Sequence, residues 1–157
     1  DRHLVVLLDE AQQLDPASLD ALKGLTNIAS ERQNFLTVIL IGQPELRQRV
    51  RRLPQVDQRI SLRYHMGALT QDEIEPYLRH RLEVAGYQGR FPFSAEAMEL
   101  LHRSSRGIPR EINRIGKLAL EHVRNQGLGD FDEAVIATVV KDLRRHGGLF
   151  EASADAL

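Results

Sequence analysis

Two short apolar runs, each ended abruptly by polar residues, constrain the fold of this chain more than any other feature. The first run is Leu4–Leu8 and the second is Leu36–Ile41, and together they hold only Leu, Val and Ile apart from one Thr. Runs of this length that are apolar on both faces are typical of strands in a parallel sheet covered on both sides. We therefore predict an α/β fold in which these segments are neighbouring parallel strands.

The segment between the two runs carries the start signals of a helix. Asp15 can accept a hydrogen bond from the first turn, and Pro16 suits the first helical position. A strand, a helix and a second strand in this order form a right-handed crossover unit. The sequence then predicts a short Arg-rich helix from Glu45 to about Leu53. A third strand is predicted at Ile60–His65, where apolar residues alternate.

After Met66 the pattern changes from strands to helices. Four helices are predicted from their start signals, which are the capping box Thr70–Glu73, then Ser94, Pro109 and Asp130–Glu133. We expect an α/β part at residues 1–65, an all-helical lobe at residues 66–146 and a flexible tail at residues 147–157.

Composition excludes several classes of function. The chain has no Cys, which rules out disulfides and thiolate metal sites and fits a reducing compartment. No apolar run is long enough to span a membrane, and the six His residues show no metal-ligand spacing. A net charge of −1 and an aromatic content of 5% do not suggest a nucleic-acid groove. Because a strand begins almost at once and the first residue is not Met, we expect a longer parent protein.

Polar residues follow both apolar runs at the point where each ends. Asp9 and Glu10 come directly after the first run, and Gln43 follows the second. In open α/β sheets, ligands bind outside the carboxyl ends of the strands. An apolar strand followed by Asp-Glu is the Walker B arrangement, in which the Asp holds Mg²⁺ and the Glu orients or deprotonates an attacking water. The group attacked in this arrangement is the γ-phosphate of a nucleotide, and Gln43 would lie beside it. A second interpretation stays open, in which these residues only cap the helices that follow.

Four sequence blocks resemble the AAA+ ATPases in order and spacing. The blocks are LVVLLDEAQQL, LIGQPEL, QRISLRYHMGALT and GIPREINRI, and the resemblance extends over about residues 4–126. The chain looks most like the branch that contains general secretion pathway protein A of bacterial type II secretion and its transposition-regulator relatives. This resemblance implies a partial P-loop NTPase sheet in residues 1–65, from Walker B to the arginine finger, and a helical lid domain in residues 66–146.

The resemblance also implies a role for each polar residue at the strand ends. Asp9 matches the Walker B ligand of Mg²⁺, Glu10 matches the Walker B catalytic glutamate, and Gln43 matches sensor 1, whose amide can position the attacking water.

Three arginines are candidates for contacts with phosphate. The resemblance implies that Arg59 is the arginine finger that reaches a neighbouring subunit's nucleotide, that Arg63 is a second candidate for this role, and that Arg110 is sensor 2. A permanently charged guanidinium suits a transition state whose charge spreads over phosphoryl oxygens. The helix dipole disfavours a cation on a first turn, which favours an anion-facing role for Arg110. For Arg59, the alternative is a surface residue at a loop end.

The sequence contains no P-loop (Walker A), the pattern GxxxxGK followed by Ser or Thr that cradles phosphates. In the AAA+ family this loop precedes the segment that matches Leu4–Leu8. We therefore expect ATP and Mg²⁺ to bind the intact parent, and this chain alone to be inactive. The family's P-loop strand lies between the strands that match Leu36–Ile41 and Ile60–His65. Without it, we expect the chain to rearrange, to pair strands between copies, or to leave Ile60–His65 detached from the sheet.

The resemblance implies a parent that hydrolyses ATP in a ring to drive assembly or transport in type II secretion. Its partners would be other copies of itself and secretion-system proteins, in the cytoplasm, with the parent anchored to the bacterial inner membrane. The alternative is a DNA-associated regulator of the transposition or initiation type, in which the nucleotide is a switch. A third interpretation is an inactive adaptor, which would apply if the parent also lacks a P-loop.

Overall fold

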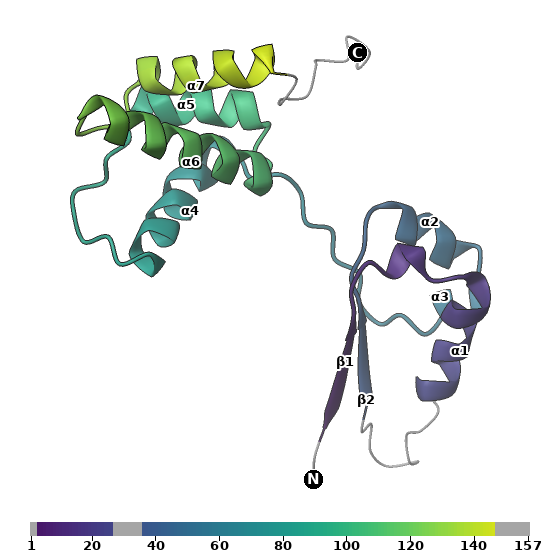
Figure 1. The fold of residues 1–157 in the computed structure, drawn as a ribbon. Coiled ribbons are helices and arrows are strands. Elements are labelled where there is room, and N and C mark those ends of the chain that lie inside the picture. Colours follow the sequence, from purple (N-terminus) through teal and green to yellow (C-terminus); the bar gives the residue numbers. More distant parts are fainter. Residues whose placement is uncertain (1–2, 27–35, 147–157) are drawn as a thin grey trace. The chain divides into compact units, whose positions relative to one another are not determined.

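The computed structural model describes residues 3–26 and 36–146 of the 157-residue chain. The fold divides into two compact units between His65 and Met66, and Figure 1 shows strands and helices in the first and only helices in the second. The predicted tail at residues 147–157 lies outside the described residues. Within the described ranges, no helix combines the length and the apolar character that a membrane crossing requires.

The first unit is built on a two-stranded parallel sheet. β1 (Leu4–Leu8) pairs with β2 (Leu36–Leu40) in a register that places Leu4 opposite Leu36 and Leu8 opposite Leu40. The chain between them contains the short 3₁₀ helix η1 (Ala11–Gln13) and α1 (Pro16–Thr26). This confirms the predicted α/β class and the two parallel strands.

Asp15 begins α1 in the way its position predicts. The backbone N–H of Ser18 donates to Asp15 Oδ1 at 2.8 Å, and the Ser18 hydroxyl donates to Asp15 Oδ2 at 2.9 Å. These bonds, the backbone bond first, hold the pKa of the Asp15 carboxyl below its usual value. The start of α1 is therefore stabilised by contacts between residues that are close in the sequence.

Two further short helices complete the first unit. α2 (Glu45–Arg51) corresponds to the predicted Arg-rich helix, and it is followed by α3 (Pro54–Asp57), which the sequence analysis did not anticipate. α1 and α2 both contact α3. Leu19, Val50 and Val56, one from each of the three helices, are buried. The three helices lie beside the sheet (Figure 1).

One face of the sheet stays exposed. Val6, Leu8 and the alternate residues of β2 are half-buried, whereas Val5, Leu7 and Ile39 are 46%, 61% and 42% exposed. The sequence predicts strands covered on both faces, and the described residues cover only one. The prediction that the second face is also covered is therefore wrong for the described part of the chain, because no described element packs on that face.

The predicted third strand at Ile60–His65 is wrong. The segment 60–70 contains neither helix nor strand, and the Leu62 and Tyr64 side chains are 84% and 87% exposed. Alternating apolar residues form a strand only where a neighbouring strand satisfies their backbone groups. Among the described residues, no strand pairs with Ile60–His65, so this segment is detached from the sheet, one of the three outcomes expected above.

The second unit is a bundle of four helices among its described residues. They are α4 (Gln71–Val84), α5 (Ala95–Ser105), α6 (Pro109–Gln126) and α7 (Glu133–Arg145). α5, α6 and α7 contact one another, and α4 packs on α5. The fully buried core residues include Ile74, Leu101, Ile112, Ile115 and Ile136. The apolar stripe of each helix thus meets the others in one core.

The predicted start signals of this unit function as caps. Ser94 Oγ accepts from the backbone N–H of Ala97 at 3.1 Å, and Asp132 Oδ1 accepts from Val135 at 2.9 Å. At the start of α4, the backbone N–H of Thr70 donates to Glu73 Oε2 at 2.9 Å, the reciprocal half of a capping box.

The segment that enters α4 is fixed to the turn between α5 and α6. Leu69 donates its backbone N–H to the carbonyl of Gly107 at 2.8 Å, and its own carbonyl lies 3.1 Å from His102 Nε2. Arg106 and Gly107 both have left-handed backbones, with φ of 54° and 68°. This double turn brings the start of α6 against Leu69.

Candidate functional site

The parallel register places the two polar strand ends side by side. Beyond the paired strands, the Ile41 N–H donates to the Leu8 carbonyl at 2.8 Å, and the Ala11 N–H donates to the Ile41 carbonyl at 2.9 Å. Asp9-Glu10 and Gln43 therefore lie at the same edge of the sheet. Parallel pairing predicts this proximity, because the carboxyl ends of parallel strands meet at one edge.

Asp9 and Glu10 are both exposed at this edge. The backbone N–H of Glu10 donates to Asp9 Oδ1 at 2.8 Å. Glu10 has φ 52° and ψ 33°, a left-handed conformation that is uncommon for a residue with a side chain. Such a backbone persists where the surrounding contacts impose it, and it is found disproportionately at functional sites.

Gln12 links the two strand ends, and the sequence analysis missed it. Its amide nitrogen donates to Glu10 Oε2 at 2.6 Å, and its amide oxygen accepts from the backbone N–H of Gln43 at 3.1 Å. The sequence signal was a polar residue two positions after Glu10. That signal does not distinguish Gln12 from Gln13, which is exposed.

The Gln12 turn fits closely against the loop after β2. A Cβ atom placed on Gly42 would lie 2.6 Å from Gln12 Oε1, so a side chain at this position would displace the amide. Arg49 of α2 donates a hydrogen bond to the Gln12 backbone carbonyl. The carbonyl and the side chain of Gln12 are thus both engaged.

The two candidate finger arginines differ in their surroundings. The Arg63 guanidinium is bound within its own chain, with Nη2 at 2.9 Å from the Asp57 carbonyl and 2.8 Å from Asp57 Oδ1. Arg59 lies two residues after the end of α3, where its backbone N–H donates to the Val56 carbonyl at 3.0 Å and its side chain is exposed. Both arginines lie in the segment that follows α3, and both stay candidates for the finger.

Arg110 belongs to the second unit, whereas the residues of the sheet edge belong to the first. It is the second residue of α6 and is exposed. The left-handed turn at Arg106-Gly107, anchored to Leu69, sets the direction in which α6 begins.

Asp9 fits the chemistry of a magnesium ligand. Mg²⁺ is commonly held by one or two carboxylates together with water and substrate phosphates. Asp9 offers an exposed carboxylate at the carboxyl edge of the sheet. Within residues 3–26 and 36–146, no three His, Asp or Glu side chains form a group that could hold a metal by themselves. The exposed Asp9 carboxylate is thus compatible with a site at which water and a phosphate would supply the other ligands.

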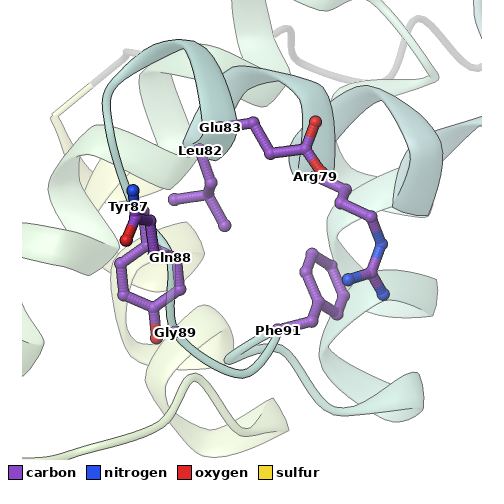
Figure 2. A pocket seen from close by; sticks show the side chains of 7 residues that line it. All are labelled: Arg79, Leu82, Glu83, Tyr87, Gln88, Gly89 and Phe91. Atoms are coloured by element: carbon purple, nitrogen blue, oxygen red, sulfur yellow. The ribbon is translucent and has the colours of Figure 1, made fainter.

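The helical unit has a surface cavity that is lined by none of these residues. It has a volume of about 250 Å³ and lies between the end of α4 and the loop that follows (Figure 2). Arg79 lies on one side, with its guanidinium carbon 4.7 Å from the centre of the Phe91 ring and Nη2 2.6 Å from Glu75 Oε1. On the other side, the Tyr87 hydroxyl donates to the Arg90 carbonyl at 2.9 Å. The Arg79 guanidinium is already engaged, and the volume of the cavity is small for a ligand site. We therefore assign this cavity no function.

Comparison with known protein families and sequences finds similar proteins, and the sequence matches extend over both units. A family model described as an AAA domain matches residues 1–50. General secretion pathway protein A of Aeromonas hydrophila is 42% identical over 162 residues, which cover 98% of this chain and 29% of that protein. An uncharacterized HTH-type transcriptional regulator of Methanocaldococcus jannaschii is 28% identical over 147 residues, which cover 91% of this chain and 36% of that protein. The chain thus spans about a third of the length of these relatives.

Solved structures with low sequence identity share the fold. The Holliday junction branch migration motor RuvB of Thermotoga maritima superimposes with a TM-score of 0.67 at 16% identity, over 96% of this chain and 48% of that one. The ORC2 protein of Aeropyrum pernix in its ADP form superimposes with a TM-score of 0.68 at 19% identity, over 89% of this chain and 40% of that one. At such identities the likeness concerns the fold alone.

Proposed function

Because the chain belongs to the AAA+ ATPases, we propose that it forms the metal-and-water half of an ATP site in a protein that hydrolyses ATP. The observation that carries this proposal is the sheet edge, where Asp9 and Glu10 end one strand and Gln43 follows its parallel neighbour. The 42% identity with General secretion pathway protein A extends over 98% of the chain and supports a role in bacterial type II secretion. We propose that the parent protein drives assembly or transport there.

Each residue of the edge has one task in this proposal. Asp9 holds Mg²⁺, directly or through water, with its exposed carboxylate. Glu10 orients the attacking water or takes its proton, and the Gln43 amide positions the same water. When bound, Mg²⁺–ATP supplies a γ-phosphoryl group whose negative charge is spread over its oxygens. The protein's contribution is to place these three side chains around the attacking water.

The phosphates need a binding element that these residues do not supply. The chain has no glycine-rich P-loop with its Lys, and such a loop provides backbone N–H groups and a cation for the triphosphate. We therefore expect residues 1–157 by themselves to bind Mg²⁺–ATP weakly and to be inactive. In the full-length product of the gene, a P-loop would complete the site.

In this proposal, the helical unit is the lid, and Arg110 is its sensor 2. The exposed guanidinium of Arg110 would contact phosphate and report its presence to α6. Arg59 would contact the nucleotide of a neighbouring copy in a ring. The proposed partners are therefore other copies of the chain and proteins of the secretion system.

The first test of this function is Mg²⁺-dependent ATP hydrolysis by the full-length product of the gene. Replacing Asp9 with Asn should lower hydrolysis at low Mg²⁺ at least tenfold, since it removes the carboxylate that is proposed to hold the ion. The matched control is Asp72→Asn, which changes an exposed carboxylate in the helical unit. Absence of Mg²⁺-dependent hydrolysis in the unsubstituted protein would contradict the proposed function.

A mixing experiment tests the role of Arg59. Arg59→Ala and Glu10→Gln subunits should each be inactive, and mixtures should regain part of the activity because some interfaces pair an intact Arg59 with an intact Glu10. The measurement is the ATPase rate across mixing ratios. The same series with Arg63→Ala is the matched comparison, because Arg63 is the second candidate for the finger. Recovery only in the Arg63 series would reverse the assignment.

One observation favours a second function. The relative from Methanocaldococcus jannaschii is an HTH-type transcriptional regulator, and its match covers 91% of this chain. A DNA-associated regulator would use the same site as a nucleotide switch. ATP-dependent binding of the full-length protein to duplex DNA, measured by fluorescence anisotropy, would favour this function over secretion.

A further inference from the structure

The Gln12 side chain forms a bridge between the two strand ends of the site. Its N–H group donates to Glu10 Oε2 at 2.6 Å, and its carbonyl oxygen accepts from the Gln43 N–H at 3.1 Å. These partners determine how the amide is oriented. If the amide were flipped, its oxygen would face a carboxylate oxygen and its nitrogen would face an N–H group. Gln12 is thus the group that ties Glu10 to the strand end that bears Gln43.

The turn that carries Gln12 is held on several sides. Ala11, the residue before it, is fully buried and donates its N–H to the Ile41 carbonyl. Arg49 binds the Gln12 carbonyl, and Gly42 leaves no more room than the amide oxygen occupies. These contacts from the backbone and from α2 therefore hold in place the turn that carries the Gln12 amide.

From this geometry we propose that Gln12 is a positioning residue for Glu10. The inference rests on the proposed ATPase function of the same site. An exposed glutamate has several rotatable bonds, and a short hydrogen bond at its carboxylate restricts the conformations that it samples. Because the other end of the amide accepts from the Gln43 backbone N–H, the Glu10 carboxylate is held at a fixed place relative to the backbone that carries the Gln43 side chain. Gln12 acts through Glu10 and does not contact the water.

The kinetic test compares Gln12→Met with Gln13→Met in the full-length product of the gene. Met keeps the length of Gln but offers no amide, and Gln13 is an exposed residue of the same short helix. Gln12→Met should lower kcat roughly tenfold with KM changed by less than about twofold, because a misplaced base affects the reaction and not the binding of ATP. Gln13→Met should retain full activity.

Two further variants separate positioning from a general effect on folding. In a Glu10→Gln background, Gln12→Met should cause little additional loss, because residues that act as a unit are not additive. Gly42→Ala, which would push the Gln12 amide aside, should lower kcat in the same way. An unchanged kcat in Gln12→Met, or fully additive losses with Glu10→Gln, would overturn the inference.

An NMR experiment on residues 1–157 tests the bridge without ATP. In isotope-labelled protein, Gln12→Met should shift the backbone amide resonance of Gln43, and Glu10→Ala should shift the side-chain amide of Gln12. Gln13→Met should leave both resonances in place. If Gln43 does not respond to Gln12→Met, the bridge is wrong whatever the enzyme does. If the bridge is present but the unsubstituted full-length protein hydrolyses no ATP, the proposed function fails, and the positioning role fails with it.

Discussion

Replacing Glu10 with Gln should lower the kcat for ATP hydrolysis by a factor of about 10² or more in the full-length product of the gene. The substitution removes the carboxylate that is proposed to orient or deprotonate the attacking water. Gln has nearly the same shape, and its side-chain oxygen can still accept the hydrogen bond from Gln12. Since Glu10 is exposed, we expect no loss of folding stability.

Steady-state kinetics and ATP binding should be measured together for this variant. The binding of a fluorescent ATP analogue should stay within about twofold of the unsubstituted protein, because the lost interaction concerns the transition state. Glu45→Gln, an exposed carboxylate in the first turn of α2, is the control and should leave kcat unchanged. If Glu10→Gln retains full turnover, Glu10 is not the base. An equal loss in kcat and in ATP affinity would instead indicate a role in binding.

Replacing Gly107 with Ala should destabilise the helical unit by roughly 2–5 kcal/mol, the sum of a left-handed backbone and a steric overlap. Gly107 has a φ of 68°. A Cβ atom there would lie 2.0 Å from the Leu69 carbonyl oxygen, which is backbone and cannot rotate away. Relief of this overlap requires that the segment entering α4 move away from the turn, which would break the hydrogen bond between the Leu69 N–H and the Gly107 carbonyl.

Urea denaturation followed by circular dichroism measures this effect, because most of the described helical residues belong to the second unit. Gly116→Ala is the matched control. Gly116 lies inside α6, and nothing lies within 4 Å of a Cβ placed there. This control should gain about 0.5–1 kcal/mol in the free energy of unfolding, since Ala favours a helix over Gly. Equal midpoints for Gly107→Ala and the unsubstituted chain would show that Leu69 yields at little cost.

Signals that act over a few residues predicted most of the fold. Asp15, Ser94 and Asp132 begin helices because a side-chain oxygen reaches a backbone N–H three residues ahead. The apolar runs at Leu4–Leu8 and Leu36–Ile41 contain the two parallel strands, as short continuous apolar runs predict. Such features depend on the local chain and can be predicted from it.

Features that depend on a distant partner were predicted less well. Ile60–His65 has the alternation of a strand, but a strand also needs a neighbour, and none is present among the described residues. In the same way, the position of Gln12 in the sequence does not reveal that its amide meets both Glu10 and the backbone of Gln43. The sequence left Arg59 and Arg63 as alternatives, because a finger is defined by its contact with a neighbouring copy.

The close contact between Gly42 and Gln12 has a consequence for redesign of this protein. The two positions lie in different strand–loop segments, yet they share one small volume, because a Cβ on Gly42 would occupy the space of the Gln12 amide oxygen. Any larger residue at position 42 therefore displaces the Gln12 amide, which would give up the bond to Glu10. A redesign that treats positions 12 and 42 as independent would therefore disturb Glu10, the proposed base, although Glu10 itself is not substituted.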